Sequence, residues 1–282
     1  MSESKPCPSD LTDVQWSFVE SVLTAWRGRR RSVSGHQGVY SMREIVNAIL
    51  HRGRTGCRWA CLPHGLSPRS ATYYWFAVRR DDGTGRVVHE LLCCQVRERV
   101  RRSEDPALVV PDTLGVHAAA GVPASTAGRG PVKRVPGRRR ALAVDVLGPV
   151  VAVIVRAANT HGSAADAALL DHVVEDTGGS VRKAPVGQGF KEQVAAHGGL
   201  VGIDVENVER NPHRAGFVPQ PKRRRADQTC GILLPHRRPV RDCEHRPASA
   251  ASRAHRATTQ VMARRLTGAN TSARRDPKVV TA

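Results

Sequence analysis

Two cysteines and a histidine lie close enough in the sequence to share a metal ion. Cys57 and Cys61 are separated by three residues, and His64 follows shortly after. Thiolate and imidazole are ligands that Zn²⁺ prefers, but a structural zinc site needs four of them, and no matching second half is found in the sequence. The seven cysteines, an odd number without regular spacing, instead indicate reduced thiols in a cytosolic protein.

Acidic side chains accompany the predicted strands of the central region. Residues 107–110 form a short apolar run that predicts a strand, and Asp112 follows just past it. Asp145 lies in a run with the alternating pattern of a half-buried strand, where it is either a functional carboxylate or a solvated or hydrogen-bonded strand residue. The acids at 204, 206 and 209 alternate along a later strand, which is typical of an exposed face.

The chain is strongly basic. Lys and Arg number 44 against 25 Asp and Glu, which gives a formal net charge of +19. Part of this excess is also what a high-GC genome with many arginine codons would encode. The basic residues are clustered, however, at 27–31, 133–140 and 222–225. Localised basic patches favour a polyanionic partner, most often nucleic acid.

The first hundred residues predict a small helical module. After a polar arm at residues 1–10, capping boxes at Thr12 and Ser41 begin two amphipathic helices. Ser67-Pro68 and the turn at 82–84 begin two more. Aromatic residues at 73–76 are typical of a helical core, with stacking on DNA bases as the minor alternative. Short turns and a basic exterior indicate a helix-turn-helix-like DNA-binding module over residues 11–104.

Two β-branched runs around Gly148-Pro149 predict a hairpin at the centre of a sheet, with a loose connection. Residues 115–140 are rich in Gly, Ala and Pro and predict a mobile loop before it. Further elements are expected as a helix at 164–177, a short helix at 191–197, a strand at 203–208, a helix from 222 that Pro235 and Pro239 interrupt, and a helix at 258–266. The last fifteen residues are expected to be disordered. No apolar run approaches the roughly 18 residues of a membrane span, and no signal peptide opens the chain.

This order of elements is that of a ribonuclease H-like core behind a basic helical domain. Over roughly residues 10–270 the chain resembles a bacterial insertion-sequence transposase of the DDE class. The motifs that carry the resemblance are Leu11-Thr12-Asp13-x-Gln15-Trp16, Arg54 to Trp59 with Leu62-Pro63-His64, Ser70-x-Thr72-Tyr73-Tyr74, Asp112-Thr113, Ala143-Val144-Asp145-x-x-Gly148, Ala158-Asn159-Thr160-His161, Gln188-Gly189-Phe190 and Gln228-Thr229.

The resemblance implies metal-dependent DNA strand cleavage and transfer, in which three carboxylates hold two Mg²⁺ or Mn²⁺ ions. The first acid corresponds to Asp112 and the third to Asp227, which replaces the usual Glu. The second corresponds to Gly187, which has no side chain, and Asp145 is the only substitute we identify. Gly162, Arg224, Arg225 and the prolines at 111, 235 and 239 are further departures from the family pattern. We therefore expect a catalytically impaired copy, or alternatively a non-catalytic DNA-binding remnant. A third alternative is a product that does not fold stably.

The fold expected is thus α/β (α+β), with the helical domain at 11–104, the ribonuclease H-like mixed-sheet core at 105–266 and a disordered basic tail at 267–282. The expected partner is double-stranded DNA at the terminal inverted repeats of a transposon. The resemblance also implies a homo-oligomer on DNA, with no membrane, in the cytoplasm near the nucleoid. The residues expected to contact DNA are Arg29, Arg30, Arg31, Lys133, Arg134, Arg138, Arg139 and Arg140.

Overall fold

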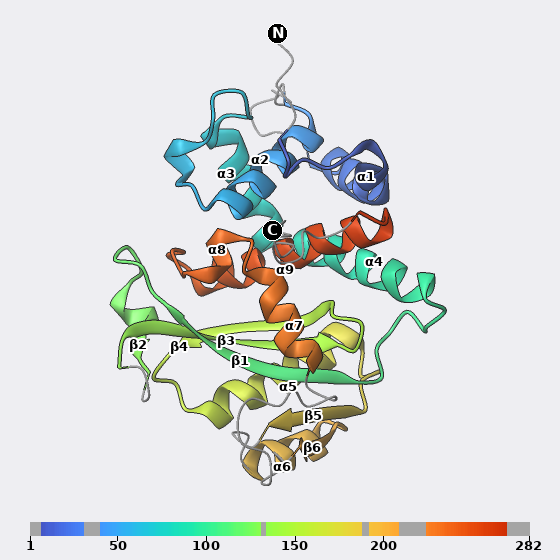
Figure 1. The fold of residues 1–282 in the computed structure, drawn as a ribbon, viewed down its shortest axis with the longest axis vertical. Coiled ribbons are helices and arrows are strands. Elements are labelled where there is room, and N and C mark those ends of the chain that lie inside the picture. The colour runs from blue at the N-terminus through green and yellow to red at the C-terminus, as the bar shows by residue number, and fades with distance from the viewer. Residues whose placement is uncertain (1–6, 31–39, 131–133, 188–191, 209–223, 270–282) are drawn as a thin grey trace, which may run out of the picture.

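The computed structural model describes residues 7–30, 40–130, 134–187, 192–208 and 224–269. Figure 1 shows helices stacked above a twisted β-sheet, with further helices below the sheet. The fold is therefore mixed α/β, with N-terminal helices followed by a largely antiparallel sheet and its covering helices. No helix in these ranges has both the length and the apolar character needed to cross a membrane.

The upper layer consists of α1 (Asp13–Gly28), α2 (Met42–Thr55), α3 (Arg69–Asp81) and α4 (Thr84–Arg99), with a short 3-10 turn η1 (Trp59–Cys61). Both predicted capping boxes are formed. The Thr12 hydroxyl accepts from the Gln15 amide, and the Ser41 hydroxyl accepts from the Glu44 amide. These caps satisfy amide groups that have no partner in the first turn of a helix, and so they fix where α1 and α2 begin.

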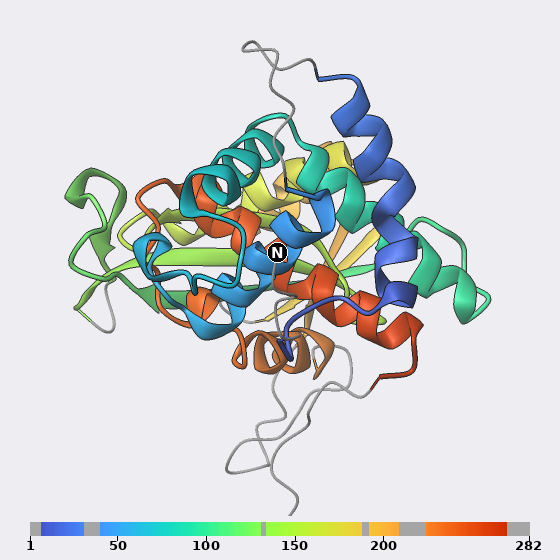
Figure 2. The same cartoon turned by 90° about the horizontal axis from the view of Figure 1, so that it is seen from above.

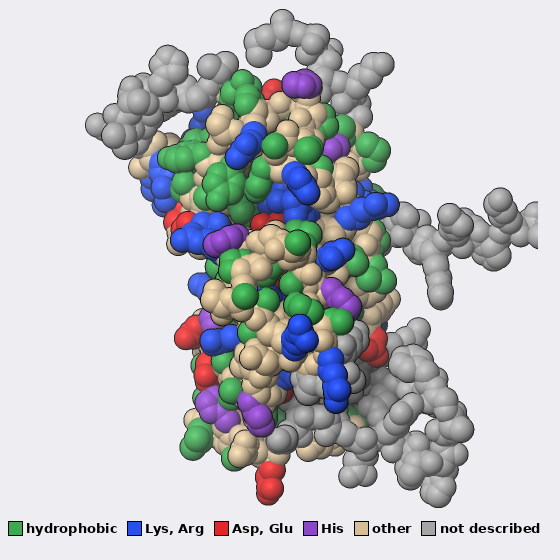
Figure 3. Space-filling model, turned by 90° about the vertical axis from the view of Figure 1, so that its left-hand side faces the viewer, with side chains coloured by type: hydrophobic (Ala, Val, Ile, Leu, Met, Phe, Trp, Pro, Cys, Tyr) green, Lys and Arg blue, Asp and Glu red, His purple; other side chains and the backbone are tan. Residues whose placement is uncertain are grey.

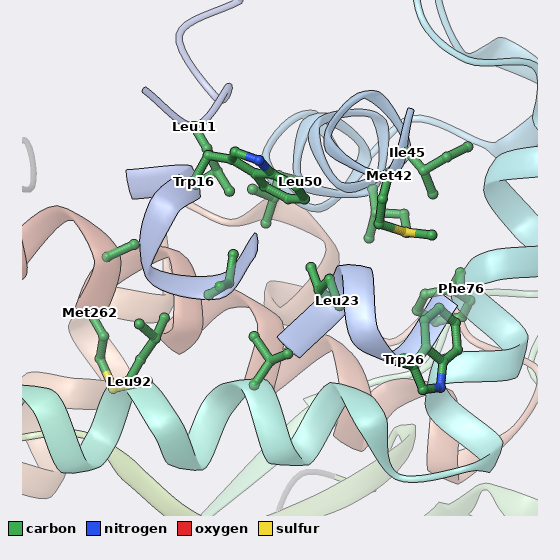
Figure 4. Close-up of a cluster of buried hydrophobic side chains, with 14 of the residues drawn as sticks. Leu11, Trp16, Leu23, Trp26, Met42, Ile45, Leu50, Phe76, Leu92 and Met262 are labelled. Atoms are coloured by element: carbon green, nitrogen blue, oxygen red, sulfur yellow. The ribbon is translucent and has the colours of Figure 1, made fainter. Parts of the chain in front are cut away.

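The core of this upper layer contains a helix from the far end of the chain. Trp16 and Leu23 of α1 and Phe76 of α3 are buried in it, as is Leu92 of α4. Met262 of α9 (Pro247–Leu266) completes the cluster, and Figure 4 shows it beside Leu92. Figure 2 shows α9 running next to α4 beneath the N-terminal helices. The helix predicted at 258–266 thus begins eleven residues earlier and joins the helical layer to the sheet.

The sheet is built on β3 (Pro136–Asp145), which pairs antiparallel with β1 (Val109–His117) on one side and β4 (Val150–Ala157) on the other. The short β2 (Gly128–Arg129) also pairs with the beginning of β3. Asp112 stands opposite Leu142 in the register. A four-residue connection joins β3 to β4, and Gly148 adopts a φ of 97° there, a conformation that residues with a side chain rarely adopt.

Two parallel strands extend the sheet beyond β1. β5 (Lys183–Gly187) and β6 (Asp204–Val208) pair with each other, and a single parallel bridge joins Leu108 to Lys183. The Lys183 amide also donates to the Ala107 carbonyl. The strands therefore lie in the order β4, β3, β1, β5, β6, with β1 in the middle.

Different helices cover the two faces of the sheet (Figure 1). α5 (Gly162–Thr177) and α6 (Glu192–Leu200) pack on one face, where Val109, Ala143 and Leu169 share a buried cluster. α7 (Arg224–Leu233), α8 (Arg237–Val240) and α9 lie on the other, where Val110 and Val144 are buried. Side chains alternate between the two faces along a strand. The residues in these two clusters therefore show which face each neighbouring strand residue points to.

Two predictions for the central region were wrong. The strand before Asp112 does not end at residue 110 but continues to His117, and the predicted mobile loop at 115–140 contains the end of β1, a 3-10 turn η2 (Ala124–Thr126), β2 and the first half of β3. Local composition suggested a loop, but nine consecutive residue pairs between β1 and β3 stabilise extended structure there. The predicted disorder of the last fifteen residues concerns mainly 270–282, which lie outside the described ranges.

Candidate functional site

Asp112 lies in the middle of β1 and points toward α7. Val110 and Leu114, which share its side of the strand, pack in the cluster beneath α7 and α9. The Asp112 side chain is half-buried. It therefore has access to solvent while lying on the central strand of a rigid sheet, a suitable position for a group that acts on a ligand.

The helix α7 brings a thiol and a second carboxylate to the same place. The Cys230 thiol donates to Asp112 Oδ2, with Sγ and Oδ2 separated by 3.6 Å. Asp227 is one helical turn before Cys230 and is exposed. The Thr229 hydroxyl donates to the Gly148 carbonyl at 2.9 Å, which holds α7 against the turn between β3 and β4. Asp112 and Asp227, the two acids selected from the sequence, thus flank Cys230.

The surroundings of Cys230 keep its thiol protonated. Its pKa is raised to about 12, first by burial and then by the negative charges of Asp112 and Asp227, whereas Arg140 lowers it. A thiol with this pKa is neutral near pH 7 and is a poor nucleophile and a poor metal ligand. Cys230 therefore acts as a hydrogen-bond donor to Asp112.

Gly187, where the resemblance implies the second acid, ends β5 next to Asp112. The parallel bridge between Leu108 and Lys183 sets the register of β1 and β5. Asp112 and Gly187 each lie four residues after this bridge, so they are opposite each other in that register. Ala184 packs on the α5 face, so alternation directs position 187 toward the same face as Asp112. The neighbouring Gln188-Gly189-Phe190 motif lies outside the described residues.

Asp145 lies elsewhere. It ends β3 on the α5 face, opposite to Asp112, and only 2% of its surface is exposed. Its Oδ2 accepts from Arg97 Nη1 at 2.7 Å. The same guanidinium donates to the Ser103 and Asp105 carbonyls, so Asp145 joins α4 and the following loop to the sheet. This geometry assigns Asp145 a structural contact and not a position beside Asp112.

The described residues around Asp112 do not fit a pair of hard divalent ions. Such ions prefer several oxygen ligands, commonly from carboxylates. Here two carboxylates flank a protonated thiol, and the position of the second acid is occupied by Gly187. Within the described ranges, no group of three or more His, Cys, Asp and Glu side chains is arranged to hold a metal ion. Cys57, Cys61 and His64 are among the residues that do not form such a group.

Two of the arginines expected to contact DNA are buried. Arg138 is fully buried and donates to Asp242 and to the carbonyls of Thr126, Glu244 and His245. Arg140 is 3% exposed and donates to the Pro239 carbonyl, and burial lowers its pKa. Because β3 is paired with β1 on one side and β4 on the other, these guanidinium groups tie the 239–245 segment to the sheet and do not reach a phosphate at the surface.

The other predicted basic residues that the structure describes lie nearer the surface. Arg29 and Arg134 are exposed, and Arg30 forms an ion pair with Asp82 at 2.6 Å. Arg139 is half-buried and faces Arg156 across β3 and β4. Arg31 and Lys133 lie outside the described residues. Of the residues predicted to contact DNA, those that the structure describes and leaves available to a surface ligand are therefore Arg29, Arg30, Arg134 and Arg139.

Cys230 and Arg97 are contact residues that sequence reasoning did not single out. Cys230 follows the Gln228-Thr229 motif, one helical turn after Asp227, and this spacing was the available signal. Arg97 lies in the arginine-rich end of α4, which predicted a solvated surface, and nothing in its local sequence distinguishes it.

Comparison with known proteins found a similarity that is confined to the helical layer. Residues 11–89 match the family described as "Putative transposase of IS4/5 family (DUF4096)". The N-terminal domain belongs to this family. No curated protein and no solved structure matched the chain.

The DUF4096 match covers α1, α2, α3 and the first part of α4, and it includes the motifs from Leu11 to Tyr74. It ends before the sheet, so the motifs around Asp112, Asp145 and Gln228 carry only the resemblance stated from the sequence. The core of the DUF4096 domain nevertheless includes Met262 of α9, well outside the matched residues.

Proposed function

We propose that this chain is a DNA-binding protein of the insertion-sequence transposase type, with a ribonuclease H-like core whose strand-cleavage centre is impaired. The observation that carries the proposal is the meeting of Asp112 and Asp227 at Cys230, beside a glycine at position 187. The core also follows the expected chain order of a strand, a hairpin, a helix, a strand and later helices.

The impairment follows from the missing carboxylate. In a complete centre of this type, bound Mg²⁺ or Mn²⁺ supplies the activation of a nucleophile and the stabilisation of a leaving oxygen. Position 187 has no side chain to contribute, and Asp227 is shorter by one methylene than the Glu that the family carries. A displacement of about 1 Å at a reacting centre can cost roughly a hundredfold in rate. Asp112 is then a residual carboxylate that binds the thiol of α7.

DNA binding is supported by the net positive charge of the chain. On the face in Figure 3, Lys and Arg side chains are spread over both the helical half and the sheet half of the molecule. Phosphate contacts by such residues are largely independent of sequence and weaken with salt. We propose double-stranded terminal repeats as the partner, a homo-oligomer as the bound form, and a location with the chromosomal DNA.

A strand-nicking assay on the terminal DNA of the encoding element, with Mg²⁺ or Mn²⁺, tests the cleavage part. The chain would be compared with Gly187→Asp, Asp227→Glu and the double variant, and Asp112→Ala would be added to each. We expect nicking only from variants with an acid at 187, and loss of that nicking with Asp112→Ala. Nicking by the unaltered chain that depends on Asp112 would overturn the impairment.

The second candidate is a DNA-binding remnant without any cleavage chemistry, and Gly187 is the residue that favours it. Fluorescence anisotropy on the same DNA separates the two functions. The remnant would be favoured by tight DNA binding without nicking by any variant. In that case the logarithm of the association constant should fall linearly with the logarithm of the salt concentration. Absence of DNA binding would overturn both candidates.

A further inference from the structure

A cavity of about 490 Å³ lies between the helical layer and the sheet, beside β4. Its volume is in the range of pockets that hold small organic ligands. Strand β3 separates β4 from β1, so this cavity is distinct from the Asp112 site. Its charged lining residues are Arg79, Arg80, Asp81, Arg86, Arg156 and Asp176.

The cationic residues of this lining exceed its acids. Arg80 pairs with Asp81, and Arg86 pairs with Asp176, each at 2.6 Å. These pairs account for both acids. Arg156 of β4 is exposed and has no ion-pair partner among the described residues. It also faces Arg139 across the strands, and like charges in such a pair repel each other.

Arg79 is the second uncompensated cation. It is 3% exposed, and its Nη2 has no hydrogen-bond partner in the described structure. The acid that attracts it, Asp82, already accepts hydrogen bonds from Trp26 and Arg30. Burial lowers the pKa of Arg79 to about 10, so it remains protonated at pH 7. A buried guanidinium with an unused donor carries an energetic cost that an anion would relieve.

Other groups at the cavity add positive potential. Pro247 and Ala248, at the N-terminus of the 20-residue helix α9, line it. This end of a helix carries a partial positive charge. Two arginines without an ion-pair partner among the described residues (Arg79 and Arg156), a helix N-terminus and a cavity of suitable size thus occur together.

We propose that this cavity binds a phosphate group, with Arg79 and Arg156 as its principal cationic residues. The group belongs either to a DNA strand or to a free nucleotide, since both present the same anion to the guanidinium groups. The inference does not rest on the cleavage centre at Asp112, because no residue is shared between the two sites.

The test is isothermal titration of the full chain with inorganic phosphate and with dAMP. Arg156→Gln removes an exposed cation, and Arg79→Gln removes the buried one. Arg43→Gln is the matched control, because it removes the same charge from α2, outside the cavity, where the half-buried Arg43 pairs with the exposed Asp13 of α1. We expect Arg156→Gln to weaken dAMP binding about tenfold. The control should bind as the unaltered chain does.

Equal weakening by Arg43→Gln, no effect of Arg156→Gln, or no saturable binding of either probe would overturn the proposal. Because Arg156 is exposed, its replacement should leave the thermal unfolding temperature unchanged, so the test does not depend on the buried variant. Competition between dAMP and a fluorescent duplex then identifies the source. If dAMP displaces the duplex from the unaltered chain but not from Arg156→Gln, the phosphate that the cavity binds belongs to DNA. If dAMP binds without displacing the duplex, the ligand is a free nucleotide.

Discussion

The Cys230 thiol donates to the Asp112 carboxylate, although the two residues are 118 positions apart in the sequence. Asp112 is held by the central strand of the sheet, and Cys230 is held by a helix that the Thr229–Gly148 hydrogen bond fixes to the β3–β4 turn. The carboxylate expected to act in catalysis is therefore bound to a neutral donor from α7.

Cys230 should react slowly with alkylating agents. A pKa of about 12 instead of 9 means a thiolate fraction roughly a thousandfold smaller at pH 8. Mass spectrometry after a short iodoacetamide pulse should find the exposed Cys61 and Cys243 modified first. Asp112→Asn removes a negative charge beside the thiol and should accelerate labelling of Cys230 specifically. Equal labelling rates in both proteins would show that Asp112 does not influence the thiol.

Asp145→Ala should destabilise the chain by about 3–5 kcal/mol, because it leaves the Arg97 guanidinium buried without its carboxylate partner. Replacing both residues, as Arg97→Leu with Asp145→Leu, should recover most of this loss. Urea unfolding of the single and double variants forms a thermodynamic cycle that measures the coupling. Additive losses would mean that the pair contributes no coupling energy.

Met262→Ala should lower the free energy of unfolding by about 2–5 kcal/mol, since it opens a cavity in the core of the helical layer. The unfolding of the DUF4096 domain and of the sheet should shift together, because α9 packs against both. Val14→Ala on the exposed side of α1 is the control and should change stability by less than about 0.5 kcal/mol. Two separate calorimetric transitions would contradict this coupling.

Stability should fall as the pH drops from 6.5 toward 4. Burial lowers the pKa of His89 to about 4, and its ring contacts Thr259 and the Val150 carbonyl. Below pH 6.5 the unfolded chain binds a proton that the folded chain excludes. The contribution of His89, on the order of 3 kcal/mol, is therefore present above pH 6.5 and is lost as the pH falls to about 4.

Thermal unfolding at several pH values checks this, with His89→Gln as the comparison. The variant should have a shallower dependence on pH in that window, with the remaining slope attributable to other histidines such as His236, whose pKa is also lowered to about 4 by burial. Parallel curves for both proteins would rule out His89 as a source of the acid sensitivity.

The sequence by itself determined the local elements of the helical layer. Capping boxes at Thr12 and Ser41 specify where helices begin, because their partners lie only three residues away. The β-branched runs around Gly148 likewise predict a hairpin, and Pro235 ends α7 as expected. Asp112 and Asp227 could also be selected in advance, but only through a resemblance to a family pattern.

Tertiary structure alone decided what depends on distant partners. Arg138 and Arg140 occur in a basic run that predicted a surface, yet pairing of β3 between β1 and β4 turns them inward to Asp242 and Pro239. The burial of Arg97 against Asp145 and the packing of α9 against α4 were likewise decided by distant partners. Local composition reports propensity over a few residues, whereas burial depends on which segments pack together, and those segments are here about fifty to more than one hundred and fifty residues apart.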